Sequence, residues 1–440
     1  MSELSAQTEP FFEPLARNSI AGLVLALLCA ASMWFYVDHV QIPHQIRDSR
    51  VHDVPRGNLS DLYPRWLGSR ELLLRHRNPY SPEITREIQR GYYGRELDLN
   101  RPNDPIDQQG FAYPVYVAFL LAPTVRFPFG PVRAAFHWFL VAVTVVSVWL
   151  WFTVLGWKTT LSTYATVAVL LLGSFPAVQG LKLQQLTLLT AFLAALSVAL
   201  ITRGRLFLAG VVLAIATIKP QLVLLLLVCL CVWALGDWTQ RKNLWWGFAA
   251  TMAVLLGASQ FVLPGWLSVF RSAMHAYRQY AGGPSIPDML LPQPVGPIVS
   301  AVALLVLLLM CWRFRKAPAD SLEFQYLVAG PLTITLLVIP KFSPYNQVFL
   351  LPVVLLIARE WRPLWRKSLP SKMACCLTAM AIGWPWLAAL GLMFTSLVLS
   401  PEHLDRAWTV PLITTLAVPV ALLIQLGWLV RAAWPAQATR

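Results

Sequence analysis

Four ionisable residues adjoin or interrupt apolar segments of this sequence. Asp61 follows the first long apolar segment, Lys182 ends a later one, and Lys219 and Lys341 each interrupt an apolar segment beside a proline. An unpaired charge buried in a bilayer costs at least about 2.5–3.5 kcal/mol, so such residues are functional candidates. A carboxylate can act as a general base, and lysines stabilise anions. The pattern predicts a site where Asp61 activates a hydroxyl group and the lysines bind a phosphate.

Each of these residues also has a purely structural interpretation. Ser60 and Asp61 are both of types preferred at the N-cap of a helix. A lysine at a helix end extends its ammonium group to the membrane surface and so avoids the burial cost. His275 and Arg278 add to the same positive field, although neither is a strong signal alone. Local pattern leaves both interpretations open.

Several aromatic, amide and cationic side chains are candidates for binding a substrate. Tyr63 belongs to an amphipathic segment after Asp61, which is typical of a helix at a membrane interface. The short apolar run after Tyr116 is either a helix that dips into the interface or a segment packed on the bundle. The remaining candidates are Lys182, Gln185, Tyr113, Tyr345 and Asn346.

The composition predicts the elements that must position these residues. Hydrophobic residues make up 57% of the 440 positions and charged residues only 13%, which favours a bilayer as the solvent. A helix needs roughly 20 apolar residues to cross about 30 Å of hydrocarbon. Several segments are about that long: 20–37, 134–155, 244–263 and 373–399. We expect an all-α integral membrane protein with one polytopic domain over residues 1–440.

Clusters of Lys and Arg in short loops predict which side of the membrane is cytoplasmic. Four clusters occur, at residues 203–205, 241–242, 313–316 and 359–372. Counting spans between these clusters gives about twelve transmembrane helices, with both termini in the cytoplasm. Residues 38–132 then form a large first outer loop with interface helices, and residues 264–297 form a second outer loop.

The breaks at Lys219-Pro220 and Pro340-Lys341 divide two apolar segments into halves that are short for a full span. If both flanks are cytoplasmic, each segment rises and returns, and its lysine lies in the outer half of the membrane. Broken backbone at that depth is tolerated where it is buried in protein or lines a watery cavity. The sequence therefore predicts a cavity that opens to the outer side.

Other kinds of site are not indicated. The formal net charge of +14 comes from loops without an aromatic-interleaved basic domain, so we expect no nucleic acid partner. The six cysteines lie within or beside apolar segments and show neither a disulfide framework nor zinc-ligand spacing. We expect them to be lipid-facing or packing residues, and we expect neither a metal nor a cofactor.

A sugar linked through one phosphate to a polyprenol suits this set of residues. Its phosphate leaving group needs charge neutralisation, which lysines can supply without a metal. The acceptor hydroxyl group needs a positioned base. A carboxylate on the face of the sugar opposite the phosphate gives displacement with inversion.

Several motifs, in their order along the chain, resemble those of glycosyltransferase family 87, whose members use polyprenyl-phosphate sugars and belong to the GT-C class of membrane enzymes. The motifs are Ser60-Asp61-Leu-Tyr, Asn78-Pro79-Tyr80, Tyr113-Pro114, Leu121-Ala-Pro123, Gln185 with the leucines after it, Arg203-Gly204-Arg205, Ile218-Lys219-Pro220 and Leu350-Leu-Pro352. Each motif is loose, and their order and spacing make the set fairly specific.

The resemblance implies a GT-C-like bundle that transfers mannose, or in some members arabinofuranose, on the outer side. It also implies that Asp61 is the general base and that Lys219 lies near the donor phosphate. Two segments depart from the family pattern. Tyr345-Asn346-Gln347 stands where members often have a His, and Pro284-Ser-Ile-Pro-Asp288 replaces an Asn-Gln-Ser-like stretch.

These observations predict a hexosyltransferase of the plasma (inner) membrane with an outward-facing active site. Its partners are a polyprenyl-phosphate sugar, expected to carry mannose, a glycan or glycolipid acceptor, and membrane lipids. Lys219, Lys341, His275 and Arg278 are expected to hold the donor phosphate. One alternative is a polyprenyl-diphosphate glycan ligase, which should need more arginine around the donor. Another is a transporter or lipid flippase, for which an internal repeat is missing.

Overall fold

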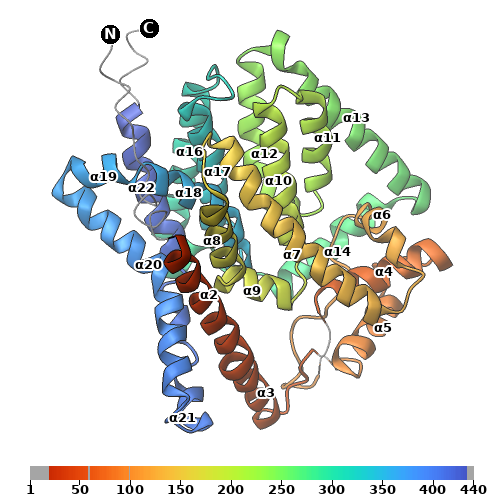
Figure 1. The fold of residues 1–440 in the computed structure, drawn as a ribbon. Coiled ribbons are helices and arrows are strands. Elements are labelled where there is room, and N and C mark those ends of the chain that lie inside the picture. Colours follow the sequence, from red (N-terminus) through yellow and green to blue (C-terminus); the bar gives the residue numbers. More distant parts are fainter. Residues whose placement is uncertain (1–18, 58–59, 99, 434–440) are drawn as a thin grey trace, which may run out of the picture.

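The computed structural model describes residues 19–57, 60–98 and 100–433, and this part of the chain is helical without any strand. Residues 1–18 and 434–440 lie outside it, so the expected side of the two termini is not addressed. Figure 1 shows a bundle of roughly aligned helices, with α4, α5 and α14 gathered at one end.

The chain begins with α2 (Ser19–Tyr36), which continues through a π-helical turn, η1 (Val37–Gln41), into α3 (Ile42–Val51). The segment after it holds α4 (Leu62–Arg75), α5 (Pro82–Tyr93), α6 (Val117–Leu121) and the 3₁₀ turn η2 (Ala122–Thr124). The first half of the bundle consists of α7 (Phe129–Val154), α8 (Leu161–Leu172), α9 (Phe175–Lys182), α10 (Leu186–Thr202), α11 (Leu206–Ala216), α12 (Pro220–Leu235) and α13 (Trp238–Val262).

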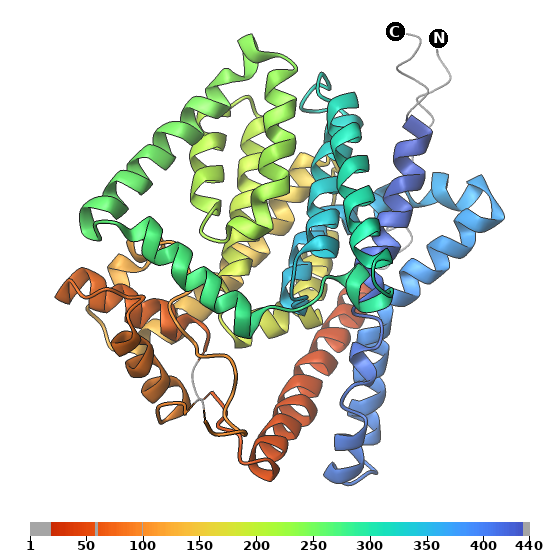
Figure 2. The same cartoon turned by 180° about the vertical axis from the view of Figure 1, so that it is seen from behind.

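The second half begins with α14 (Trp266–Ala281) and the short α15 (Ile286–Leu290). Figure 2 shows α14 lying across the bundle rather than along it. The remaining elements are α16 (Val295–Arg313), α17 (Leu322–Val338), the 3₁₀ segment η3 (Pro344–Leu350), α18 (Leu351–Arg359), α19 (Trp361–Lys367), α20 (Leu369–Thr395), α21 (Pro401–Arg406), η4 (Val410–Leu412) and α22 (Ala417–Ala433).

The chain is a multi-pass membrane protein by the length and apolar character of its helices. Within the described residues, six helical stretches are long enough to span: Ile20–Val51, Phe129–Val154, Trp238–Val262, Val295–Arg313, Leu369–Thr395 and Pro401–Arg431. The pair α8 and α9, bent by 61°, makes a seventh if the two helices form one span, and five further apolar helices are shorter. The expected count of about twelve spans therefore stays a prediction, as does the membrane position of the helices within residues 38–132.

Proline sets the two expected helix breaks. Helix α11 ends at Ala216, and Pro220 begins α12, a position that suits proline because the first helical residue needs no N–H bond. Helix α17 ends at Val338, and Pro344 begins η3. The sequence therefore predicted both turns correctly, and each turn carries its lysine.

Glycine allows two of the helices in this region to approach closely. A Cβ atom added to Gly210 of α11 would lie 2.0 Å from the carbonyl oxygen of Leu244, and one added to Gly247 of α13 would lie 2.0 Å from that of Phe207. Small residues permit such backbone contact between membrane helices. The packing of α11 on α13 therefore sets the position of α11, the helix that precedes Lys219.

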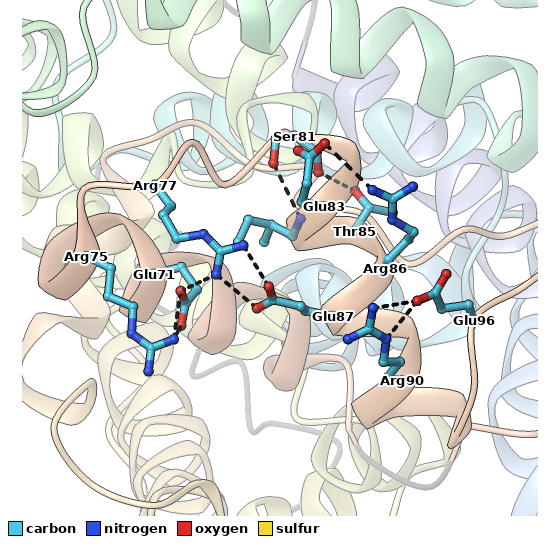
Figure 3. A network of polar contacts seen from close by, with 11 residues as sticks. Glu71, Arg75, Arg77, Ser81, Glu83, Thr85, Arg86, Glu87, Arg90 and Glu96 are labelled. Atoms are coloured by element: carbon cyan, nitrogen blue, oxygen red, sulfur yellow. Dashed lines mark hydrogen bonds and ion pairs between the residues drawn. The ribbon is translucent and has the colours of Figure 1, made fainter.

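Ion pairs join α4 to α5 at the end of the bundle where α14 also lies. The Glu71 carboxylate is only 2% exposed and accepts from Arg75 (3.0 Å) and Arg77 (2.8 Å). Arg77 also pairs with Glu87 of α5, at 2.6 Å, and Figure 3 shows this network. Because Glu71 is buried, its two arginine partners supply the hydrogen bonds that water would otherwise make.

One expectation about the cysteines was wrong. Cys229 of α12 and Cys311 of α16 form a disulfide bond, with Cα atoms 5.6 Å apart. The two residues are separated by 82 positions. No local spacing could have indicated the pair, because it depends on how two apolar helices pack side by side.

Candidate active site

A cavity of about 640 Å³ opens where the turns between the apolar helices meet the helices of residues 60–121. Its walls come from the start of α4, the segment before α6, the turns 183–185, 217–219 and 339–343, and the side of α14. Eight of the candidate residues line it, and they are Asp61, Tyr113, Gln185, Lys219, Arg278, Lys341, Tyr345 and Asn346. The cavity therefore gathers residues from six separate parts of the sequence.

Asp61 occupies the N-cap position of α4, but its side chain makes no capping hydrogen bond. Its Oδ1 atom accepts from the Tyr92 hydroxyl group (3.2 Å), and its Oδ2 atom accepts from the Gln185 amide. The neighbouring Ser60 is not the N-cap residue, and its hydroxyl group donates to the side chain of Gln184. The carboxylate is thus part of the cavity wall. Helix capping does not account for its presence.

The surroundings of Asp61 raise the pKa of its carboxyl group above that of an exposed aspartate. Burial raises the pKa of this carboxyl group, and the Asp107 carboxylate raises it further. Arg65, Lys219 and the Tyr92 hydrogen bond oppose that rise without reversing it. A carboxyl group whose pKa lies closer to neutral accepts a proton more readily, which suits a general base.

Lys219 is buried at the end of the α11–α12 turn, with 5% of its surface exposed. Its Nζ atom donates to Oε1 of Gln185 (2.8 Å) and to Oγ1 of Thr187 (2.7 Å). The ammonium group also faces the ring of Tyr345, 5.3 Å from its centre. These contacts satisfy a charge that would otherwise be costly to bury.

Lys341 and Arg278 bring exposed charges to the same cavity from two different elements. The Lys341 ammonium group lies 5.9 Å from the ring centre of Tyr277 on α14. The backbone of Lys341 is left-handed, with φ of 62°, and its N–H donates to the Gly283 carbonyl (3.0 Å). Non-glycine residues rarely adopt that conformation, and such strain often marks functional sites.

Three candidate residues do not line the cavity. His275 is exposed on α14, one turn before Arg278. Tyr63 faces a surface groove between α4 and α5, and Lys182 pairs with Asp38 at 2.6 Å. Their expected roles in binding therefore find no support in their position.

The structure also adds residues that sequence reasoning missed. Arg65 lies one helical turn after Asp61, donates to its backbone carbonyl and packs 4.7 Å from the ring centre of Tyr113. Asp107 supplies a second carboxylate to the cavity. The spacing of Asp61 and Arg65 was a usable signal, because residues four apart share a helix face. Neither Asp107 nor Tyr92 gave a signal, because both depend on long-range packing.

Among the residues that the structure describes, no group of three or more His, Cys, Asp or Glu side chains is arranged to hold a metal ion. The cavity nevertheless combines opposite charges. Asp61 and Asp107 provide acceptors, while Arg65, Lys219, Lys341 and Arg278 provide cations. This arrangement can accept a proton at one place and stabilise a negative leaving group at another.

Comparison with known proteins gives one family. The model of glycosyltransferase family 87 matches residues 111–340, which include Tyr113, Gln185, Lys219 and Arg278 but neither Asp61 nor Lys341. No curated protein and no solved structure matches the chain. Since the match covers more than half of the sequence, the chain belongs to glycosyltransferase family 87 and is a membrane glycosyltransferase.

Proposed function

We propose that this enzyme transfers a single sugar, mannose, from a polyprenyl phosphate to an acceptor hydroxyl group with inversion. The observation that carries the proposal is the common cavity of Asp61, Lys219, Lys341 and Arg278. Asp61 removes the proton from the acceptor, which is a glycan or a glycolipid. The cations stabilise the phosphate that leaves with the polyprenol, a role that cations fill without proton transfer.

The four proposed phosphate ligands differ in how their positions support the role. Lys341 and Arg278 are exposed to the cavity, so both can meet a lipid-linked phosphate that enters it. Lys219 lies deeper and keeps one N–H bond beyond its two protein partners. His275 has the weakest support because it lies on α14 outside the cavity lining. No metal takes part in the proposed reaction.

The proposed location is the plasma (inner) membrane, with the cavity on the outer side and both termini in the cytoplasm. Contact between clusters of Lys and Arg from different short loops supports this orientation. The buried Arg241 at the start of α13 donates to the carbonyl of Arg315 after α16 (2.7 Å), so two of the four basic clusters meet. Positively charged short loops favour the cytoplasmic side.

Sugar transfer by membranes that contain Asp61→Asn tests the proposal. With polyprenyl phosphate mannose as donor, we expect a loss of about 10²–10⁴-fold, the usual contribution of a general base. The thermal unfolding temperature should stay level or rise, because an amide relieves the burial of a charge. Asp48→Asn is the matched control, since Asp48 is exposed and pairs with His52 on the surface. Activity at the wild-type level in Asp61→Asn would contradict the assigned base.

A polyprenyl-diphosphate glycan ligase is a second candidate, and one observation favours it. Such a donor carries more negative charge, and the cavity holds two arginines, Arg65 and Arg278, besides its lysines. Purified enzyme supplied with monophosphate and diphosphate donors of the same polyprenol distinguishes the candidates. Turnover of the diphosphate donor alone would replace the first proposal with the second.

A further inference from the structure

We propose that Gln185 is a positioning residue that links the donor-phosphate site to the general base through two hydrogen bonds. Its side-chain carbonyl accepts from Lys219 at 2.8 Å, and its side-chain amide donates to the carboxylate of Asp61. This inference rests on the proposed function, in which Asp61 is the base and Lys219 meets the phosphate.

The chemistry of the two neighbours fixes the orientation of the Gln185 amide. A lysine ammonium group only donates hydrogen bonds, and an ionised carboxylate only accepts them. Reversing the amide would direct its NH₂ group at Lys219 and its carbonyl oxygen at Asp61, and both hydrogen bonds would be lost. Gln185 is 3% exposed, so water cannot replace these partners easily. Lys219 therefore holds Gln185 in the one orientation that serves Asp61.

The turn that carries Gln185 also holds the backbone of Asp61. The Asp61 N–H donates to the Leu183 carbonyl (3.0 Å), and Ser60 donates to the side chain of Gln184. Gln184 has a left-handed backbone, with φ of 51°. Three consecutive residues of one turn thus contact Ser60 and Asp61, so the direction of the carboxylate depends on this turn.

The other end of the link belongs to the phosphate site. Two of the three N–H bonds of the Lys219 ammonium group go to Gln185 and Thr187, and Thr187 is in turn 3.1 Å from Oδ1 of Asn346. The third N–H bond remains for the cavity that Lys219 lines. A donor phosphate bound there orients Lys219 and, through Gln185, the base.

The proposed link predicts a change in the pKa of Asp61 when Gln185 is replaced. A role of Gln185 in substrate binding alone would not predict this change. A hydrogen bond to the ionised form of a carboxyl group lowers its pKa, so removal of the Gln185 amide raises the pKa of Asp61. The other groups that face Asp61 remain in place: Arg65, Tyr92, Asp107, Tyr113, Lys219, Tyr277 and Tyr345. The acid limb of the pH profile should therefore move to higher pH when Gln185 is replaced.

The test compares Gln185→Leu and Gln185→Glu in purified enzyme with polyprenyl phosphate mannose. For Gln185→Leu we expect a 10–100-fold lower kcat, little change in the donor KM and an acid limb shifted to higher pH. Gln185→Glu keeps an acceptor for Lys219 but places a second carboxylate beside Asp61. We therefore expect kcat to fall and the acid limb to shift to higher pH at least as far as in Gln185→Leu. This second variant keeps the hydrogen bond to Lys219 and serves if the leucine variant does not fold.

Gln425→Leu is the matched control, because Gln425 is equally buried but lies in α22 beside Thr378, outside the cavity lining. It should leave the kinetics unchanged. A higher KM with unchanged kcat and acid limb in the Gln185 variants would overturn the inference alone and make Gln185 a substrate contact. Wild-type activity of Asp61→Asn would overturn the proposed function and the inference with it. In the Asp61→Asn background, Gln185→Leu should cause no further loss of kcat.

Discussion

In the proposed reaction Asp61 must lose its proton before it can act as the base, so its environment should determine the pH range in which the enzyme works. Burial in the cavity wall raises its pKa, while Arg65 and Lys219 oppose that rise. The enzyme therefore keeps the carboxylate partly shielded and still leaves cations near it. Together the two effects set the pKa of the proposed base.

The acid limb of the pH profile should report this raised pKa. A base is inactive when protonated, so kcat/KM should fall as the pH drops through the pKa of Asp61. An ordinary aspartate has a pKa near 3.9, and we expect the midpoint to lie above that value. The measurement is kcat/KM between pH 4 and pH 8 in detergent, with unfolding monitored at each pH. A limb centred near pH 4 would show that burial does not raise the pKa.

Single residues differed in how well the sequence revealed them. Asp61 and Lys219 could be predicted because a charge beside an apolar segment is costly and because both belong to motifs that resemble a family. Arg65 was within reach, since it lies one turn from Asp61 on an expected helix. Tyr92 was not, because its hydrogen bond to Asp61 requires that α5 pack beside the start of α4.

Helix ends and the segment before α6, rather than helix faces, supply most of the cavity wall. The turns 183–185, 217–219 and 339–343 deliver Gln185, Lys219 and Lys341, and proline lies within or beside two of these turns. Such breaks are visible in a sequence because proline disfavours a continuous helix. The packing that aligns the turns is less visible, since it depends on contacts such as that of Gly210 with α13.

Glycine at the contact of α11 with α13 should be required for stability. Gly247→Ala places a Cβ atom 2.0 Å from the Phe207 carbonyl oxygen, so we expect a loss of about 1–3 kcal/mol, typical of overpacking. Thermal unfolding in detergent measures the effect. Gly257→Ala is the matched control in the same helix, because its Cβ atom meets nothing within 4 Å. The control should be neutral or slightly stabilising, and equal unfolding temperatures for the two variants would contradict the packing argument.

At the scale of the whole molecule, the sequence predicted an all-helical membrane bundle and a common cavity for two distant lysines. The apolar composition and the two proline breaks were sufficient for both. The number of spans could not be settled in the same way, because α10, α11, α12 and α17 are each shorter than an ordinary span. The disulfide between Cys229 and Cys311 was also missed, since only the packing of α12 on α16 brings the two residues together.

The proposed orientation predicts opposite accessibility for two exposed positions. Arg271→Cys on α14 should react with a membrane-impermeant thiol reagent in intact cells, because α14 carries cavity residues on the outer side. Lys242→Cys at the start of α13 should react only after the membrane is permeabilised, since it belongs to a basic turn. Labelling of both variants is compared with that of the unmodified protein, whose own cysteines set the background. Equal labelling of the two positions in intact cells would exclude the orientation.

The backbone hydrogen bond between Gly283 and Lys341 joins two segments of the cavity wall. It connects the segment after α14 to the left-handed residue between α17 and η3, and a Cβ atom at Gly283 would lie 3.3 Å from the Cα atom of Lys341. Substitution of Lys341 removes the side-chain charge but leaves this backbone hydrogen bond intact. Any displacement of the end of α14 should therefore be transmitted through the main chain to Lys341, which lines the same cavity.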